Sequence, residues 1–227
     1  MSIADNIAQI RAKIAEYAVA GGRPADAVRL LAVSKTFPAA DIAEARETAN
    51  QFMFGENRVQ ELVEKAPVLP DDIQWHIIGH LQSNKAAKAA ELAHWVHSVD
   101  SEKLLNKLQA GAEAANRTLN ILLEVNWTGE ESKSGIRSAD EALRLAEKAM
   151  FCKNLNLRGL MTMAEFDATE ARLRETFSGV RELRDRMERE LGQTLPELSM
   201  GMSGDFREAI LEGATIVRIG TAIFGRR

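Results

Sequence analysis

The chain has 227 residues with 29 Lys or Arg and 33 Asp or Glu, and its net charge of −4 argues against a general nucleic-acid binder. One cysteine excludes an internal disulfide framework, and with only four histidines we expect no metal site. No stretch approaches the roughly 18 apolar residues of a membrane span, and residues 1–17 carry charges every few positions and lack the apolar core of a signal peptide. We therefore expect a cytoplasmic protein without membrane contact.

Short apolar runs alternate with amphipathic stretches along the chain. The first element is a helix that Ser2 caps and Gly21 ends, with apolar residues at positions 3, 7, 10, 14 and 17 on one stripe. The apolar runs predict strands at residues 28–34, 52–54, 73–78, 94–99, 119–127, 155–163, 198–202 and 215–219. The stretches between them predict helices at residues 39–49, 57–66, 84–92, 102–115, from Ser138, from about Asp167, 205–211 and 221–224.

Strands that alternate with helices indicate a parallel sheet covered by helices. Eight such units predict an α/β fold, a (β/α)8 TIM barrel with an extra N-terminal helix, as a single domain over residues 1–227. An open doubly wound sheet is the alternative, but no G-x-G-x-x-G motif follows the first strand. The pattern therefore favours the barrel.

Lys35 ends the first apolar run, and functional groups of such barrels come from the C-terminal ends of the strands. Burial of that strand end would partly desolvate the amine, lower its pKa and leave more neutral amine to form an imine with a carbonyl. The structural alternative is a lysine that reaches solvent from the strand end.

Two loops near the C-terminus combine glycine with a hydroxyl. The loop after the seventh strand carries Ser203, and the loop after the eighth carries Gly220 and Thr221. Glycine lets the backbone approach an anion, to which hydroxyls and amides donate, whereas helix capping is the alternative role of each hydroxyl. We expect both loops to face Lys35 across the barrel and to bind the phosphate of a phosphorylated carbonyl compound.

Further polar residues lie at the same ends of the strands. Arg218 alternates with apolar residues in the last strand, so it either pairs with a carboxylate such as Glu56 or Glu124 or faces a ligand ring nitrogen. Beside a pyridine, its permanent charge would discourage protonation of the ring. Asn57 is either a helix cap or a hydrogen-bond partner of a ring hydroxyl, and Lys133 is either an exposed loop lysine or a second reactive amine.

Seven sequence blocks carry a family resemblance that covers nearly the whole chain. They read LLAVSKTFP, FGENRVQE, WHIIGHLQSNK, KSGI, GLMTM, LSMGMSGD and VRIGTAIFG, in that order. Together they resemble the YggS/PROSC family of pyridoxal phosphate homeostasis proteins. The resemblance implies a barrel similar to the N-terminal domain of alanine racemase, with pyridoxal 5′-phosphate (PLP) held through an imine to Lys35. It implies ligand contacts from Ser203, Gly220 and Thr221 to the phosphate, from Arg218 to the pyridine nitrogen, and from Asn57 and Met200 to the ring.

The resemblance also implies a function: PLP, or vitamin B6, homeostasis and delivery to apo PLP-dependent enzymes by a monomer without catalytic turnover. A two-base racemase would need a tyrosine opposite the lysine, and Tyr17, the only one, lies on the apolar stripe of the first helix. The alternatives are a PLP-dependent amino-acid racemase or lyase, and a Schiff-base aldolase acting on a phosphosugar. We expect Lys133 to assist movement of the cofactor from Lys35 to an outside amine.

Overall fold

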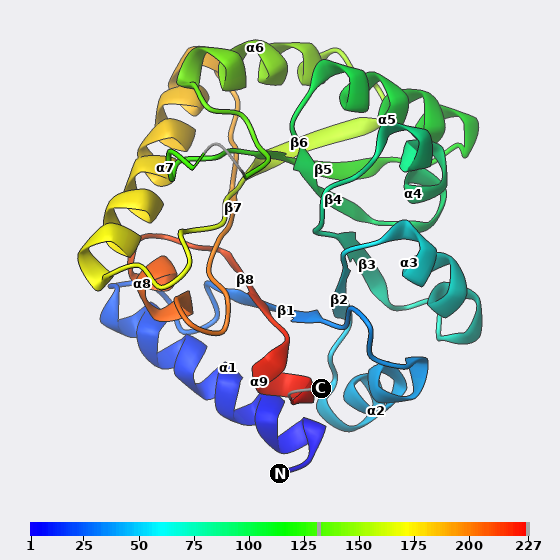
Figure 1. The fold of residues 1–227 in the computed structure, drawn as a ribbon, viewed down its shortest axis with the longest axis vertical. Helices are drawn as coiled ribbons and strands as arrows, with labels where there is room; N and C mark the ends of the chain where they lie inside the picture. Colours follow the sequence, from blue (N-terminus) through cyan, green and yellow to red (C-terminus); the bar gives the residue numbers. More distant parts are fainter. Residues whose placement is uncertain (131–132, 226–227) are drawn as a thin grey trace.

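Eight short strands pair in sequence order and close into a parallel barrel, with the helices outside it (Figure 1). The computed structural model describes residues 1–130 and 133–225. The strands are β1 (Arg29–Val33), β2 (Met53–Glu56), β3 (Gln74–Ile77), β4 (Trp95–Val99), β5 (Leu119–Glu124), β6 (Leu155–Met161), β7 (Glu197–Ser199) and β8 (Ile216–Ile219). Because β1 pairs with both β2 and β8, the sheet has no edge, which confirms the predicted barrel over the open sheet.

The helices that follow these strands bury their apolar faces against the barrel. They are α2 (Ala39–Ala49), α3 (Val59–Lys65), α4 (Ala86–Leu92), α5 (Glu102–Ala114), α6 (Ala139–Met150), α7 (Glu170–Leu191), α8 (Phe206–Leu211) and α9 (Thr221–Phe224), with 3-10 turns at Ala66–Val68 and Ser83–Lys85. Among the helices of the described residues, none is long and apolar enough to cross a lipid bilayer.

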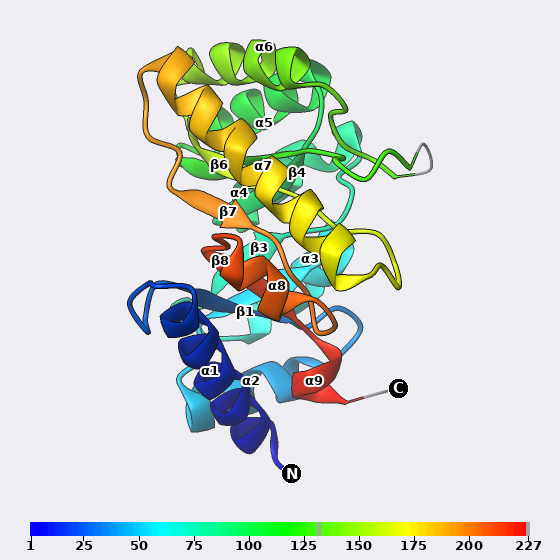
Figure 2. The ribbon, with the colours of Figure 1, turned by 90° about the vertical axis from the view of Figure 1, so that its left-hand side faces the viewer.

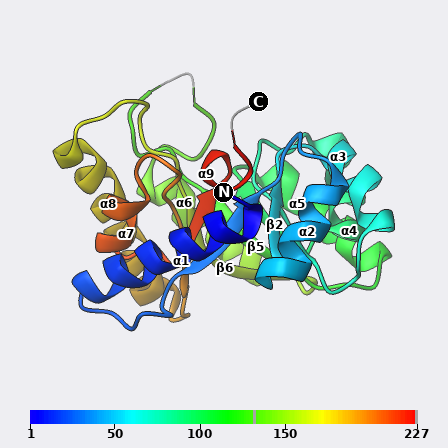
Figure 3. The same ribbon diagram turned by 90° about the horizontal axis from the view of Figure 1, so that it is seen from below.

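The predicted N-terminal helix is α1 (Ile3–Ala20), which lies on the outside of the barrel. Ser2 and Asp5 form the capping box that starts it. It packs against α2, α8 and α9, and Asn6 donates a hydrogen bond of 2.8 Å to the Ile223 carbonyl of α9 (Figures 2 and 3). The helix therefore joins the first and last elements of the barrel.

Several predicted boundaries were wrong, and turn chemistry explains one clearly. The helix expected from Asp167 begins at Glu170 instead, because Thr169 caps it by accepting from the Arg172 amide. Asp167 itself has φ +56°, a left-handed conformation that no helix continues. The fifth strand ends at Glu124 rather than at residue 127, and Val125 makes only a single bridge, to Ile136.

The side chains form two separate apolar layers. A large outer core fills the space between the strands and the helices. Inside the barrel, smaller clusters fill the lumen, one of Leu31, Val33, Ile78 and Ile216 and another of Trp95, Leu122 and Met161. The barrel is therefore packed with side chains along its axis, as expected for eight strands.

Polar groups also lie inside the barrel, and they are hydrogen-bonded to one another. The rings of His76 and His97 approach to 2.9 Å between nitrogens, and His97 Nδ1 lies 2.9 Å from Ser199 Oγ. All three residues are fully buried. Burial lowers the pKa of both histidines well below the usual 6.5, so they are neutral in the folded chain. Within the described residues, no cluster of three potential ligands could hold a metal ion.

The neutral histidines predict a specific acid destabilisation. Below pH 6.5 the unfolded chain binds protons that buried His97 does not accept, so the free energy of unfolding falls as the pH falls. The free energy of unfolding, measured by urea unfolding between about pH 5 and 7.5, should change less steeply with pH in His97→Gln than in the wild type. The difference in slope should reach up to about 1.4 kcal/mol per pH unit. His80→Gln, which changes a side chain that is 60% exposed, is the matched control. Parallel profiles for wild type and His97→Gln would refute the prediction.

Candidate functional site

Lys35 follows β1 at the C-terminal end of the barrel, where the sequence predicted it. The residue is exposed, so the burial expected for this strand end does not extend to Lys35. The difference arises from the turn that begins at Ser34: Ser34 is fully buried, whereas the next two residues lie at the surface. Thr36 has φ +64°, an unusual conformation for a β-branched residue.

The loops after β7 and β8 lie beside Lys35, not across the barrel from it as predicted. Strand order decides this, because β8 is hydrogen-bonded to β1 and β7 is the next strand. A side chain added at Gly220 would lie 3.1 Å from the Val33 carbonyl, so the β8 loop closely approaches the end of β1. The Arg218 amide in β8 donates to the Gly201 carbonyl at 2.9 Å and joins the β7 loop to the last strand. Three consecutive strand ends thus meet at one place.

The two loops present hydrogen-bond donors that are not used by the described residues. No described residue accepts from the backbone amides of Ser203, Gly204, Thr221 and Ala222, or hydrogen-bonds the hydroxyls of Ser203 and Thr221. Asp205 and Gly220 occupy the N-cap positions of the neighbouring helices without side-chain capping bonds, so neither hydroxyl is the helix cap that the alternative required. The loops therefore present a group of donors suited to an anion.

Arg218 projects into the barrel from β8 and is 4% exposed. Its guanidinium donates to the carbonyl and hydroxyl of Ser199, at 2.6 and 2.8 Å, and to the Thr162 carbonyl at 2.8 Å. Burial lowers the pKa of Arg218 to about 10, opposed by the charges of Asp205 and Glu124, so it stays charged at neutral pH. Of the two alternatives for Arg218, the carboxylate pair is not found: neutral oxygens of Ser199 in β7 and of Thr162, which follows β6, accept from this cation.

Asn57 and Met200 lie in different layers. Asn57 follows β2 and is half-buried, and Arg58 rather than Asn57 is the residue that precedes α3 as its cap. A side chain added at Gly79 would lie 2.6 Å from the Asn57 carbonyl, so the β2 and β3 loops are in close contact there. Met200 is 1% exposed and belongs to the outer core. The structure therefore brings Asn57, but not the Met200 side chain, to the rim near Lys35.

Lys133 lies in the loop after β5, on the far side of the barrel from β1. Its amine donates to the Ala164 carbonyl at 2.9 Å and lies 3.2 Å from Glu130, so it is not a freely exposed loop lysine. Nearby, Glu124 is 3% exposed and accepts from Ser134 at 2.9 Å, while no described residue donates a hydrogen bond to its second oxygen. Burial raises the pKa of Glu124.

A buried network behind Lys35 was missed by the sequence analysis. Glu56 is fully buried, and one of its oxygens accepts from Ser34 Oγ at 2.7 Å and from Lys65 Nζ at 2.8 Å. Burial raises the pKa of Glu56 to about 7 against the opposing effect of these two donors. The only sequence signal was the spacing of Glu61 and Lys65, which is equally typical of surface pairs.

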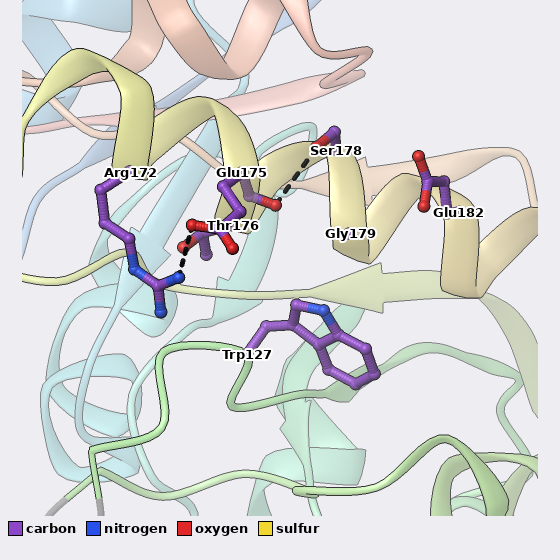
Figure 4. Close-up of a pocket in the computed structure, with 7 residues that line it drawn as sticks. All are labelled: Trp127, Arg172, Glu175, Thr176, Ser178, Gly179 and Glu182. Carbon is purple, nitrogen blue, oxygen red and sulfur yellow. Dashed lines mark hydrogen bonds and ion pairs between the residues drawn. The ribbon is translucent and has the colours of Figure 1, made fainter.

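A separate cavity of about 290 Å³ lies between Trp127 and helix α7 (Figure 4). Its lining residues are Trp127, Arg172, Glu175, Thr176, Ser178, Gly179 and Glu182. None of them is a predicted site residue, and Arg172 and Glu175 are paired with each other at 2.7 Å. We therefore place the candidate site at the ends of β7, β8, β1 and β2, where unused donors and an amine lie together.

Comparisons with known proteins support the barrel fold. The family model of the alanine racemase N-terminal domain matches residues 2–227. A pyridoxal phosphate homeostasis protein of Pseudomonas aeruginosa is 47% identical over 227 residues, covering 100% of this chain and 96% of that protein. PipY of Synechococcus elongatus, solved with PLP bound, has a TM-score of 0.86 and 37% identity, and the match covers 99% of this chain and 100% of PipY.

More distant structures share the fold alone. A D-threonine aldolase from Filomicrobium marinum has a TM-score of 0.79 at 20% identity, and this chain covers 61% of it. The match to the homeostasis protein, by contrast, covers 100% of this chain and 96% of that protein at 47% identity. The predicted resemblance is confirmed: the chain belongs to the alanine racemase N-terminal domain family, among the pyridoxal phosphate homeostasis proteins.

Proposed function

We propose that this protein reversibly binds PLP at the rim of the barrel and takes part in PLP homeostasis and delivery without catalytic turnover of its own. One observation carries the proposal: the unused donors of the β7 and β8 loops lie beside Lys35 on three consecutive strands. A ligand that carries an aldehyde and a phosphate on one small ring can reach the Lys35 amine and the loop donors at the same time. PLP-bound PipY, 37% identical over nearly the whole chain, supports the same ligand.

The residues present fit the proposed ligand. Ser203, Gly220 and Thr221 would hold the phosphate, because the amides and hydroxyls around them have no acceptor among the described residues. Lys35 would hold the aldehyde carbon through an imine. Asn57 lies on the adjacent strand end, where it would contact the ring. Met200 would contribute backbone atoms only, since its side chain lies in the outer core.

Arg218 would face the pyridine nitrogen. PLP supplies an electron sink for carbanion chemistry, and it does so best when the ring nitrogen is protonated. A buried arginine held by three hydrogen bonds keeps a positive charge at that place and disfavours ring protonation. This environment supports tight binding better than it supports chemistry at a substrate α-carbon.

Replacement of Lys35 tests the proposed ligand contact. Lys35→Ala should abolish a yellow, borohydride-trappable chromophore that forms when the wild type is mixed with PLP. Because Lys35 is exposed and lies outside the core, the melting temperature should change little. Absorbance spectra before and after borohydride, with mass spectrometry of the reduced protein, measure both results. An unchanged chromophore in the variant would mean that another lysine forms the imine, with Lys133 as the first candidate.

The absence of turnover has its own test. Tyr17, the only tyrosine, is partly buried in α1 and packs 5.7 Å from the Phe206 ring, so it is not available as a second acid or base. The PLP-loaded protein should therefore leave the α-protons of D- and L-amino acids unexchanged in D2O, as followed by NMR. Exchange above that of free PLP, and lost in Lys35→Ala, would favour the racemase or lyase alternative.

We further propose that Lys133 assists movement of PLP from Lys35 to an outside amine. Its amine lies on the same rim, held by Ala164 and Glu130. Lys133→Ala should slow transfer of PLP to an apo-enzyme, measured as recovery of that enzyme's activity. Lys153→Ala, which removes an exposed lysine at the opposite end of the barrel, is the control. Equal transfer rates for wild type and Lys133→Ala would rule out this role.

A further inference from the structure

The backbone on both sides of Lys35 is held by buried polar groups that point away from the barrel interior. Leu31 and Val33 face inward, so strand alternation turns Ser34 outward. Glu56 at the end of β2 is turned outward in the same way, and its carboxylate accepts from Ser34 Oγ at 2.7 Å. Both residues are fully buried between the barrel and α3. The strand end before Lys35 is thus joined to the end of β2.

Lys65, at the last position of α3, completes this junction. Its ammonium donates to the Ser34 carbonyl at 3.0 Å, to Glu56 at 2.8 Å and to Glu61 at 3.0 Å. An ammonium has three N–H donors and no acceptor, so all three N–H groups of the Lys65 ammonium are used in these hydrogen bonds. The side chain is 10% exposed, and a lysine so deeply placed needs such partners.

The residue after Lys35 is held by the same group. The Thr36 amide donates a hydrogen bond to Glu61 Oε2, the oxygen that also accepts from Lys65. At φ +64° the Thr36 backbone occupies a conformation that a β-branched residue rarely adopts without external support. Glu61 supplies that support. We call Ser34, Thr36, Glu56, Glu61 and Lys65 the Lys65 clamp.

We propose that Lys65 and its two carboxylates are positioning residues for Lys35. The inference rests on the proposed PLP function. In the step concerned, the neutral Lys35 amine attacks the aldehyde carbon, a C=N bond forms, and the carbonyl oxygen leaves as water with the two amine protons. Lys65 touches none of these atoms. It fixes the backbone before Lys35 directly and the backbone after Lys35 through Glu61, so that the Lys35 side chain projects from a single backbone conformation.

The clamp also reaches the second strand end of the site. Glu56 immediately precedes Asn57, so the contact of Lys65 with Glu56 fixes the backbone from which Asn57 projects. The β7 and β8 loops, by contrast, contain no member of the clamp. Loss of the clamp should therefore impair the covalent step at Lys35 more than it impairs phosphate binding. Loss of a purely structural ion pair would instead impair adduct formation and phosphate binding to the same extent.

The test compares two ligands on the same variant. Lys65→Met keeps the length of the aliphatic chain and removes the three donors. We expect the absorbance of the PLP adduct to grow at least about tenfold more slowly than in the wild type. Binding of pyridoxine 5′-phosphate, which has the same ring and phosphate but no aldehyde, should stay within about threefold of wild type. Lys88→Met, which removes an exposed lysine paired with Glu91, is the matched control.

Each outcome decides the question. Adduct formation at the wild-type rate in Lys65→Met would overturn the inference, as would equal losses of adduct formation and pyridoxine 5′-phosphate binding. Should Lys65→Met fail to fold, Glu61→Ala replaces it, because that side chain is 18% exposed and its loss releases Thr36 with less disturbance of the core. A wild type that forms no adduct would overturn the proposed function itself.

Discussion

Closure of the barrel between β1 and β8 is the constraint on which the site depends. The register pairs Leu31 with Arg218 and Ala32 with Ile219, so the first and last strands end side by side. Lys35 and Thr221 are separated by most of the chain but follow adjacent strands. Helix α1 reinforces the junction from outside through its contacts with α2, α8 and α9. Without closure, the donors of the last loop and the amine of the first would lie at opposite edges of a sheet.

The barrel wall divides the polar residues into two groups with different roles. Inside, the guanidinium of Arg218 donates to neutral oxygens of Ser199 and Thr162, so the buried cation is hydrogen-bonded without direct contact to a carboxylate. Outside, between strands and helices, the cation of Lys65 is paired with Glu56 and Glu61. We propose that the inner cation faces the ligand, whereas the outer one is fully paired within the protein. Strand alternation produces this division.

Sequence periodicity predicted the element order well because each strand and helix carries its own local signal. It was weakest at the ends of elements, as at Asp167, where a turn of left-handed conformation delays α7. It also erred on side-chain environment. Lys35 is exposed rather than buried, and the carboxylate partner, one of the two alternatives for Arg218, is replaced by carbonyl and hydroxyl oxygens. These properties depend on neighbours from distant parts of the chain, which no local pattern contains.

The sequence by itself determined the alternation of strands and helices and the barrel, and it supplied the candidate amine and the candidate anion-binding residues that we propose for the strand ends. The tertiary structure alone decided that the β7 and β8 loops adjoin Lys35 instead of facing it, that Met200 belongs to the outer core, and that Lys65 is buried. The physical reason is that period and residue type are local properties, while adjacency around a closed barrel and burial arise only when all eight strands pair.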